Sequence, residues 1–138
     1  MVDQVGSLGQ QMWDFVYAYD AAYDRAAREV GLSAAQACLL KAVAERPVTM
    51  GELASRLLCD ASNVTQIVTR LESKGLVRRQ PGARDGRSKE VVITPDGAVL
   101  DERMRVAFTF PVERLGLLSS DARDALGSAL DVMLGRDG

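Results

Sequence analysis

The sequence predicts a mainly α-helical fold with one small β-hairpin, an α+β chain that forms a single domain over residues 1–138. Three observations predict it. Apolar residues recur at helical spacing, most of these segments begin at a capping residue, and two short strand-like segments flank a loop rich in glycine and arginine. A chain of 138 residues can bury a sufficient core without a metal or disulfide bonds.

The first helix is predicted from about Leu8 to Val30, and Gly31 ends it. Aromatic side chains widen its apolar face beyond a single stripe: Trp13, Phe15 and Tyr17. A face of this width favours contact with more than one neighbour.

Two shorter helices are predicted over residues 33–45 and 49–58. Each begins with a capping box, in which a hydroxyl side chain and a glutamine or glutamate three residues later satisfy each other's backbone N–H groups. The pairs are Ser33 with Gln36 and Thr49 with Glu52.

A fourth helix is predicted over residues 61–74, capped by Asp60 and ended by Gly75. With the helix before it, it makes a helix-turn-helix. Four apolar residues at the spacing i, i+3, i+4, i+7 are expected to face inward: Val64, Ile67, Val68 and Leu71.

The outward face of this helix carries short and medium polar side chains and no acids, whereas a solvated helix usually mixes lysine and glutamate. These side chains are Ser62, Asn63, Thr65, Gln66, Thr69 and Arg70. Asparagine and glutamine can bond adenine edges in a major groove, and serine and threonine can bond bases or phosphates. The alternative is a simple solvent-facing helix.

Two strands are predicted over residues 76–80 and 89–93, joined by a loop whose tip is basic. Arginines at this tip are long enough to enter a minor groove. Asp85, between Arg84 and Arg87, can pair with an arginine and hold the shape of the tip. Such a hairpin directly after a helix-turn-helix is called a wing.

Thr94 and Pro95 begin a long fifth helix, which Pro111 is expected to kink or divide. Ser119 caps a last helix that runs through Leu134.

The net charge of −2 conceals an uneven distribution. Residues 70–89 hold seven basic and two acidic side chains, a local charge of +5, so that the rest of the chain carries −7. A basic segment on an acidic body is typical of a surface that binds phosphates.

The composition also excludes several classes of protein. The chain has no histidine and two cysteines, which removes the common zinc sites and histidine-based catalysis, so we expect neither an enzyme nor a cofactor. No apolar stretch reaches the length of a membrane span and no signal peptide opens the chain, which favours the cytoplasm. Cys38 and Cys59 lie in apolar runs and are expected to be buried, with a redox switch as the minor alternative.

The order of these elements resembles that of the MarR (multiple antibiotic resistance regulator) family, and the resemblance covers almost the whole chain. Several stretches carry it, in order and with matching spacing: residues 50–54, 60–65, 70–72, 74–79, 85–88 and 93–97. Each stretch alone is a weak signal, and together they make a strong one.

The resemblance implies a winged helix-turn-helix protein that binds double-stranded DNA as a homodimer and reads a pseudo-palindromic operator. Residues 32–93 would form the DNA-binding lobe, and residues 7–31 and 95–134 the dimerisation lobe. The expected DNA contacts are Ser62, Asn63, Thr65, Gln66, Thr69, Arg70, Arg84, Arg87 and Lys89, with Asp85 and Arg87 as the structural pair of the wing. The family pattern often has an acidic residue where Gly82 stands, which leaves the wing-tip geometry open.

Many members of the family bind small aromatic or phenolic compounds between the two lobes, and the resemblance implies a repressor that such a ligand releases from DNA. Trp13 and Tyr17 are candidates to line such a pocket, although aromatic residues at helical spacing more often serve a core or an interface. The first helix lacks the cysteine of peroxide-sensing members. A thiol-based regulator and a winged-helix module that binds only proteins are the remaining alternatives.

Overall fold

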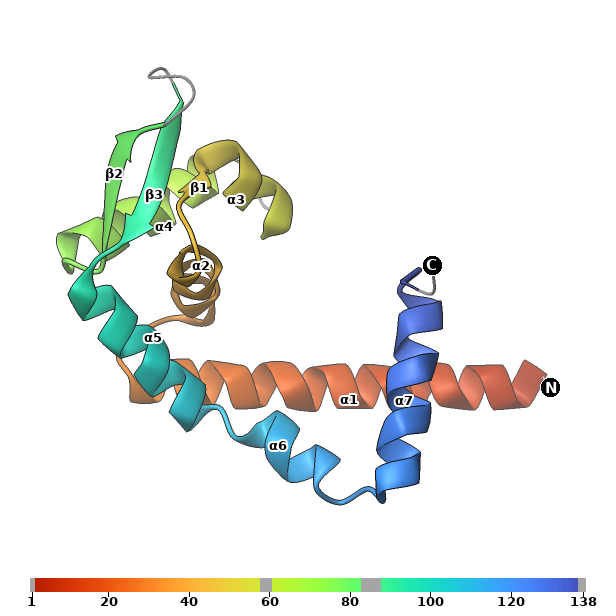
Figure 1. Cartoon of the computed structure of the whole chain (residues 1–138). Helices are drawn as coiled ribbons and strands as arrows, with labels where there is room; N and C mark the ends of the chain where they lie inside the picture. Colours follow the sequence, from red (N-terminus) through yellow and green to blue (C-terminus); the bar gives the residue numbers. More distant parts are fainter. Residues whose placement is uncertain (1, 58–60, 83–87, 137–138) are drawn as a thin grey trace. The chain divides into compact units, whose positions relative to one another are not determined.

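The computed structural model describes residues 2–57, 61–82 and 88–136, and its contacts divide the chain into two compact units, residues 1–108 and 109–138. The first unit contains α1 (Val2–Glu29), α2 (Ala34–Ala44), β1 (Val48–Thr49), α3 (Met50–Arg56), α4 (Ala61–Ser73), β2 (Val77–Pro81), β3 (Lys89–Ile93) and α5 (Pro95–Ala107) (Figure 1). The second contains α6 (Phe110–Leu115) and α7 (Ser120–Met133). The predicted mainly helical fold with a small β-hairpin is confirmed.

Within the described residues, the predicted capping residues and terminal glycines are found at the helix ends, but α1 begins at Val2 and not near Leu8. The hydroxyl of Ser33 accepts from the Gln36 N–H at 3.1 Å, and the Gln36 side chain accepts from the Ser33 N–H at 3.1 Å. Gly31 follows α1 with φ +80°, a left-handed conformation that favours glycine. The Asp60 cap lies outside the described residues.

The hairpin belongs to an antiparallel sheet with the order β1-β3-β2. The prediction of a single two-stranded hairpin was therefore incomplete. β1 holds two residues, too short for an alternating pattern, and its Val48 lies opposite Val91, both fully buried. This third strand attaches the hairpin to the start of α3.

Helix α2 is the centre of the first unit, in contact with α1, α4, α5 and β3 (Figure 1). Its side chains supply much of the core, and those of α4 and the sheet close it. The largest fully buried side chains are Leu39, Leu40, Val43, Val48, Leu53, Val64, Val68, Leu71, Val77 and Val91. The position of α4 is thus set by its own buried face against α2.

The long fifth helix is divided, as predicted. α5 ends at Ala107, Phe108 leaves the helical conformation with ψ 81°, and Pro111 lies in the first turn of α6. A proline there has no N–H to donate to the Ala107 carbonyl, which explains the interruption. In the second unit, the Ser119 hydroxyl caps α7 by accepting from the Ala122 N–H at 3.1 Å.

None of the described helices combines the length and the apolar character that a membrane crossing requires.

Candidate nucleic-acid interface

Helix α4 has the two faces that the sequence predicts. Val64, Val68 and Leu71 are fully buried, and Ile67 is 8% exposed. The six residues predicted for the outward face are all exposed: Ser62, Asn63, Thr65, Gln66, Thr69 and Arg70. The helix therefore presents a continuous polar surface without an acidic side chain among those six.

A polar hollow of about 180 Å³ lies beside this surface, where α4 passes the first turn of α2. It is lined by Asn63, Gln66, Ile67 and Arg70 of α4, and by Ser33 and Gln36. The structure thus brings three of the predicted contact residues together with a helix start. The sequence predicted Ser33 and Gln36 only as a helix cap. Their proximity to α4 could not be predicted, because local sequence does not indicate which helix packs beside them.

The end of α4 is fixed to its surroundings. Gly75 adopts φ +74°, and the Leu76 N–H donates to the Leu71 carbonyl at 3.0 Å, which turns the chain directly into β2. The Lys74 ammonium donates to the Gly31 carbonyl at 3.2 Å. Lys74 therefore ties α4 to the loop before α2.

The side chain of Arg79 joins the hairpin to α4. Its guanidinium donates to the Thr69 hydroxyl at 2.5 Å and to the Thr65 carbonyl at 3.3 Å, and pairs with Glu72 at 3.3 Å. The Arg79 backbone N–H also donates to the Glu72 carboxylate at 3.2 Å. From the sequence, Arg79 was considered only as part of the local positive charge. These contacts show that it also holds the hairpin against α4.

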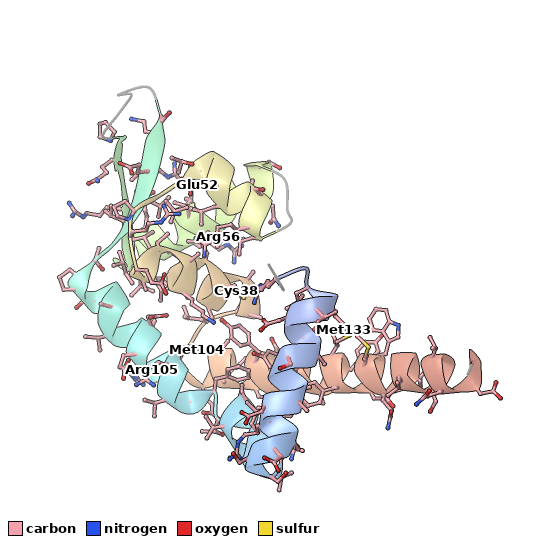
Figure 2. The ribbon with its side chains drawn as sticks, turned by 45° about the vertical axis from the view of Figure 1, so that its right-hand side comes forward. Cys38, Glu52, Arg56, Met104, Arg105 and Met133 are labelled. Atoms are coloured by element: carbon pink, nitrogen blue, oxygen red, sulfur yellow. The ribbon has the colours of Figure 1, made fainter. Side chains whose placement is uncertain are left out.

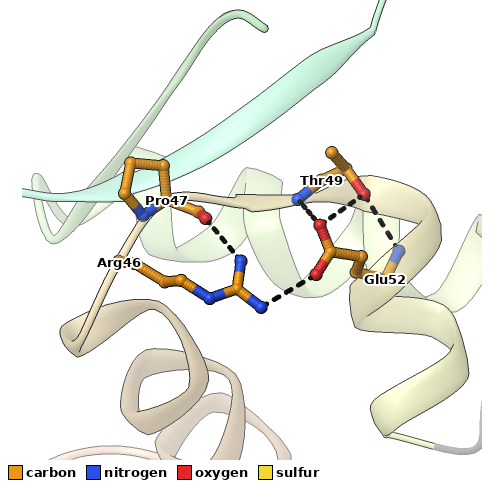
Figure 3. Close-up of polar contacts among 4 residues, drawn as sticks. All are labelled: Arg46, Pro47, Thr49 and Glu52. Atoms are coloured by element: carbon orange, nitrogen blue, oxygen red, sulfur yellow. Dashed lines mark hydrogen bonds and ion pairs between the residues drawn. The ribbon is translucent and has the colours of Figure 1, made fainter. Parts of the chain in front are cut away.

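The start of α3 is held by a small polar network (Figure 3). Thr49 and Glu52 form the predicted capping box, and the Arg46 guanidinium bonds the Glu52 carboxylate at 3.0 Å and the Pro47 carbonyl at 3.1 Å. The bond from Arg46, followed by that from the Thr49 N–H, lowers the pKa of Glu52. An ionised Glu52 thus fixes the entry into the helix-turn-helix.

At the hairpin, the Gly82 N–H donates to the Ser88 carbonyl at 2.6 Å, closing the base of the predicted wing. Lys89 and Arg78 are exposed on its strands. The tip residues Arg84, Asp85 and Arg87 lie outside the described residues, so their predicted roles stay predictions.

A cleft of about 260 Å³ lies between α1, α2 and α5, where Figure 2 labels Met104 and Arg105. Its walls are part apolar and part charged: Tyr23, Lys41, Ala44, Glu45, Asp101, Met104, Arg105 and Phe108. Burial raises the pKa of the Asp101 carboxyl. The rings of Tyr23 and Phe108, which both line the cleft, meet edge to face at 5.0 Å.

The predicted pocket residues Trp13 and Tyr17 do not line this cleft. They stack on each other at 5.7 Å, and are 59% and 67% exposed on α1. Tyr23, about two to three turns further along the same helix, supplies an aromatic wall of the cleft instead. The width of the apolar face of α1 gave no indication of which ring would face α5.

The prediction that Cys38 is buried was wrong, since its side chain is exposed. Cys38, Lys41 and Glu45 share the outward stripe of α2 at helical spacing, while Leu39, Leu40 and Val43 face the core. Burial, followed by the interaction with the nearby Cys38 thiol, raises the pKa of Tyr23. Cys59 lies outside the described residues.

Large apolar side chains remain exposed on α1 and on the second unit, each considered by itself. On α1 they include Val5, Leu8, Met12, Trp13, Phe15, Val16 and Tyr17. On the second unit they include Val112, Leu117, Leu126, Leu130, Val132 and Met133. Exposed apolar surface of this extent is characteristic of an interface.

The chain is similar to known regulators in sequence and in structure. The profile described as MarR family matches residues 30–88. An uncharacterized HTH-type transcriptional regulator from Mycobacterium leprae is 37% identical over 91 residues, which cover 65% of this chain and 64% of that protein. The chain therefore spans just under two thirds of the length of this curated relative.

Two solved structures extend the similarity to nearly the whole chain. The transcriptional regulator BldR from Sulfolobus solfataricus is 30% identical, with 98% of this chain and 97% of that chain covered and a TM-score of 0.77. A mutant MarR from E. coli complexed with operator DNA is 25% identical, with 97% and 98% covered and a TM-score of 0.77. With the exposed polar face of α4 and the hairpin behind it, these similarities show that the chain belongs to the MarR family of winged helix-turn-helix transcriptional regulators.

Proposed function

We propose that this protein is a sequence-specific DNA-binding repressor that acts as a homodimer on a pseudo-palindromic operator. The observation that carries the proposal is the exposed, acid-free polar face of α4. In an α-helix that enters a major groove, Asn63 and Gln66 can bond adenine edges, and Thr65 and Thr69 can bond bases or touch a thymine methyl.

Positive charge around this face supports DNA as the partner. Arg70 lies on α4 itself, and Arg78 and Lys89 are exposed on the two strands of the hairpin. The wing arginines Arg84 and Arg87 would add minor-groove contacts on the flank of the site. A module that binds only proteins would leave this combination of charge and hydrogen-bonding groups without a use.

The exposed apolar surface of α1 supports a homodimer. Pairing with a second copy is the usual way to cover such a surface, and a twofold axis would place two α4 helices about one DNA turn, roughly 34 Å, apart. Val16→Asp should therefore dissociate the protein in sedimentation equilibrium, whereas Glu29→Gln on the same helix should leave its mass unchanged.

A small aromatic effector is the proposed releasing ligand, and the cleft between α1, α2 and α5 is its proposed site. The cleft volume suits a single ring, with Phe108 and Met104 as apolar walls and Lys41 as a partner for a carboxylate or phenolate. Salicylate should weaken operator binding only as far as it prefers the DNA-incompetent state. Met104→Trp, which fills the cleft, should abolish the response and leave DNA binding intact.

The decisive experiment selects duplexes from a random pool with the purified protein. We expect enrichment of one pseudo-palindrome, bound at least about a thousandfold more tightly than a scrambled duplex at physiological salt. Failure to enrich any sequence would contradict the proposal and favour the protein-interaction alternative. Enriched genomic fragments would then identify the regulated genes.

The exposed thiol of Cys38 supports a second candidate, regulation by oxidation. An organic hydroperoxide would oxidise the thiolate to a sulfenic acid and leave as the alcohol. The new oxygen would lie near Tyr23, which lines the proposed effector cleft. If cumene hydroperoxide weakens operator binding of the wild type but not of Cys38→Ser, this candidate stands; if both respond alike, it fails.

A further inference from the structure

The register of the hairpin determines which way its two consecutive arginines point. Arg79 lies opposite Val91, which is fully buried, and Arg78 lies opposite Val92. Residues directly opposite each other in an antiparallel pair have their side chains on the same face, and neighbours along a strand alternate. Arg79 therefore points toward α4, and Arg78 points to the opposite face.

On α4, the three partners of Arg79 form one stripe. Thr65, Thr69 and Glu72 follow the spacing i, i+4, i+7, which places them on one side of a helix. The planar guanidinium spans this stripe, with Nη2 on Thr65 and Thr69 and Nε on Glu72. The Arg79 backbone N–H occupies the second oxygen of Glu72. Both the strand and its side chain are thus attached to α4.

This contact lies at the surface but is less exposed than the other described ion pairs. The Arg79 and Glu72 side chains are 32% and 35% exposed, whereas in each of the other pairs both side chains are at least 40% exposed. Glu72 also cancels the charge of Arg79 locally. A phosphate would have to compete with this carboxylate for the same guanidinium, so Arg79 is poorly suited to be a phosphate contact.

The contact also sets the chemistry of one predicted base-reading residue. The Thr69 hydroxyl accepts from Arg79, which leaves its proton free to donate. Donation to a phosphate oxygen, guanine O6 or thymine O4 is then the favoured role of Thr69.

We infer that Arg79 is a positioning residue for DNA recognition, a clamp that fixes the hairpin to the recognition helix so that both read the same site in register. The inference rests on the proposed function. It assigns different roles to two neighbouring arginines that could not be distinguished from the amino-acid sequence. Arg79 determines discrimination between DNA sequences, and Arg78 contributes positive charge.

The test uses the full-length protein, a 30-base-pair duplex selected by the wild type from a random pool, and a scrambled duplex of the same composition. Dissociation constants are measured at several salt concentrations for the wild type, Arg79→Gln, Arg79→Lys and Arg78→Gln. Thermal unfolding of each variant checks that it remains folded.

For Arg79→Gln and Arg79→Lys we expect about a tenfold or larger loss of affinity for the selected duplex, little change for the scrambled one, and an unchanged salt slope. Arg78→Gln should preserve the affinity ratio of the two duplexes. Lysine keeps the charge but lacks the planar guanidinium that contacts three partners, so Arg79→Lys should not restore affinity for the selected duplex. The clamp would be overturned if Arg79→Lys bound both duplexes like the wild type. It would also be overturned if Arg79→Gln lost affinity equally for both duplexes and its salt slope fell by about 0.9.

Glu72→Gln gives a second, independent test, which also applies if Arg79→Gln does not fold. Removal of an acid beside DNA should tighten binding to both duplexes if only charge matters. The clamp predicts the opposite for the selected duplex, a loss of discrimination, and tighter binding to both would overturn it. If the wild type enriches no sequence, both the proposed function and the clamp fail. If the wild type enriches a sequence and Arg79→Lys has the same affinity as the wild type for both duplexes, only the clamp fails.

Discussion

Gly97 packs against the carbonyl oxygen of Leu76 so closely that a Cβ at position 97 would overlap it. The same Cβ would lie 2.8 Å from the Ile93 side chain. The Gly97 N–H also donates to the Thr94 hydroxyl at 3.0 Å, and the Thr94 N–H donates to the Leu76 carbonyl at 3.0 Å. The first turn of α5 is therefore seated on the junction between α4 and β2.

Gly97→Ala should destabilise the protein by roughly 1–3 kcal/mol, because backbone on both sides must move to admit the methyl group. Chemical denaturation measures this directly. Gly51→Ala is the matched control, since nothing lies within 4 Å of a Cβ at that helical position, and it should be neutral or slightly stabilising. Equal effects of the two substitutions would mean that the close approach has no energetic consequence.

Much of this architecture follows from local sequence rules. Capping boxes located the starts of α2 and α3, and the spacing of Val64, Ile67, Val68 and Leu71 gave the buried face of α4. Such signals are readable because each depends on residues within two turns of one another.

Features that depend on distant partners were not predictable. β1 exists because Val48 meets Val91, 43 residues further along the chain. The role of Arg79 depends on how the hairpin lies against α4, and Tyr23 became a cleft wall through its contact with Phe108. The burial of Cys38 was misjudged for a local reason: its apolar neighbours outweighed the Lys41 and Glu45 stripe that marks the outer face of α2.

Cys38→Ser should remove a fast reaction with a thiol reagent such as 5,5′-dithiobis(2-nitrobenzoate). The exposed Cys38 side chain is accessible to the reagent in the folded protein, so its modification should not require unfolding. Cys59→Ser, which leaves Cys38 in place, is the control and should retain the fast phase. Absence of a fast phase in Cys59→Ser, in which Cys38 is the remaining cysteine, would contradict the exposed position.

Glu52→Gln should lower the melting temperature at pH 7 and flatten its dependence on acid pH. The Arg46 bond lowers the pKa of Glu52 in the folded protein below its ordinary value of 4.5. This contribution to stability is present above that value and is lost as pH falls through the lower folded pKa. The difference between wild type and variant should therefore shrink on acidification.

Arg46→Met serves as the partner variant, because it removes the same bond from the other side. It should reproduce the loss at pH 7, and the double variant should lose less than the two single effects added together. Calorimetry from neutral to acid pH measures both. Additive effects, or a difference that grows on acidification, would show that the Arg46–Glu52 contact does not stabilise the start of α3.

Gln66→Ala and Arg87→Ala should affect DNA binding in different ways, and each serves as the control for the other. Gln66 is exposed at the centre of the α4 face and has an amide that can pair with an adenine edge. Its loss should relax discrimination at one base pair, at about 1–3 kcal/mol, with the salt slope unchanged. Arg87 belongs to the predicted wing tip, which lies outside the described residues.

If Arg87 contacts the backbone from the minor groove, its loss should weaken binding to all duplexes and lower the salt slope by about 0.9. A mobility-shift series over several salt concentrations, with the selected duplex and single-base variants of it, distinguishes the two effects. Should Arg87→Ala bind like the wild type, the Arg87 side chain would have no part in affinity. Should Gln66→Ala keep full discrimination, the polar face of α4 would not be the base-reading surface.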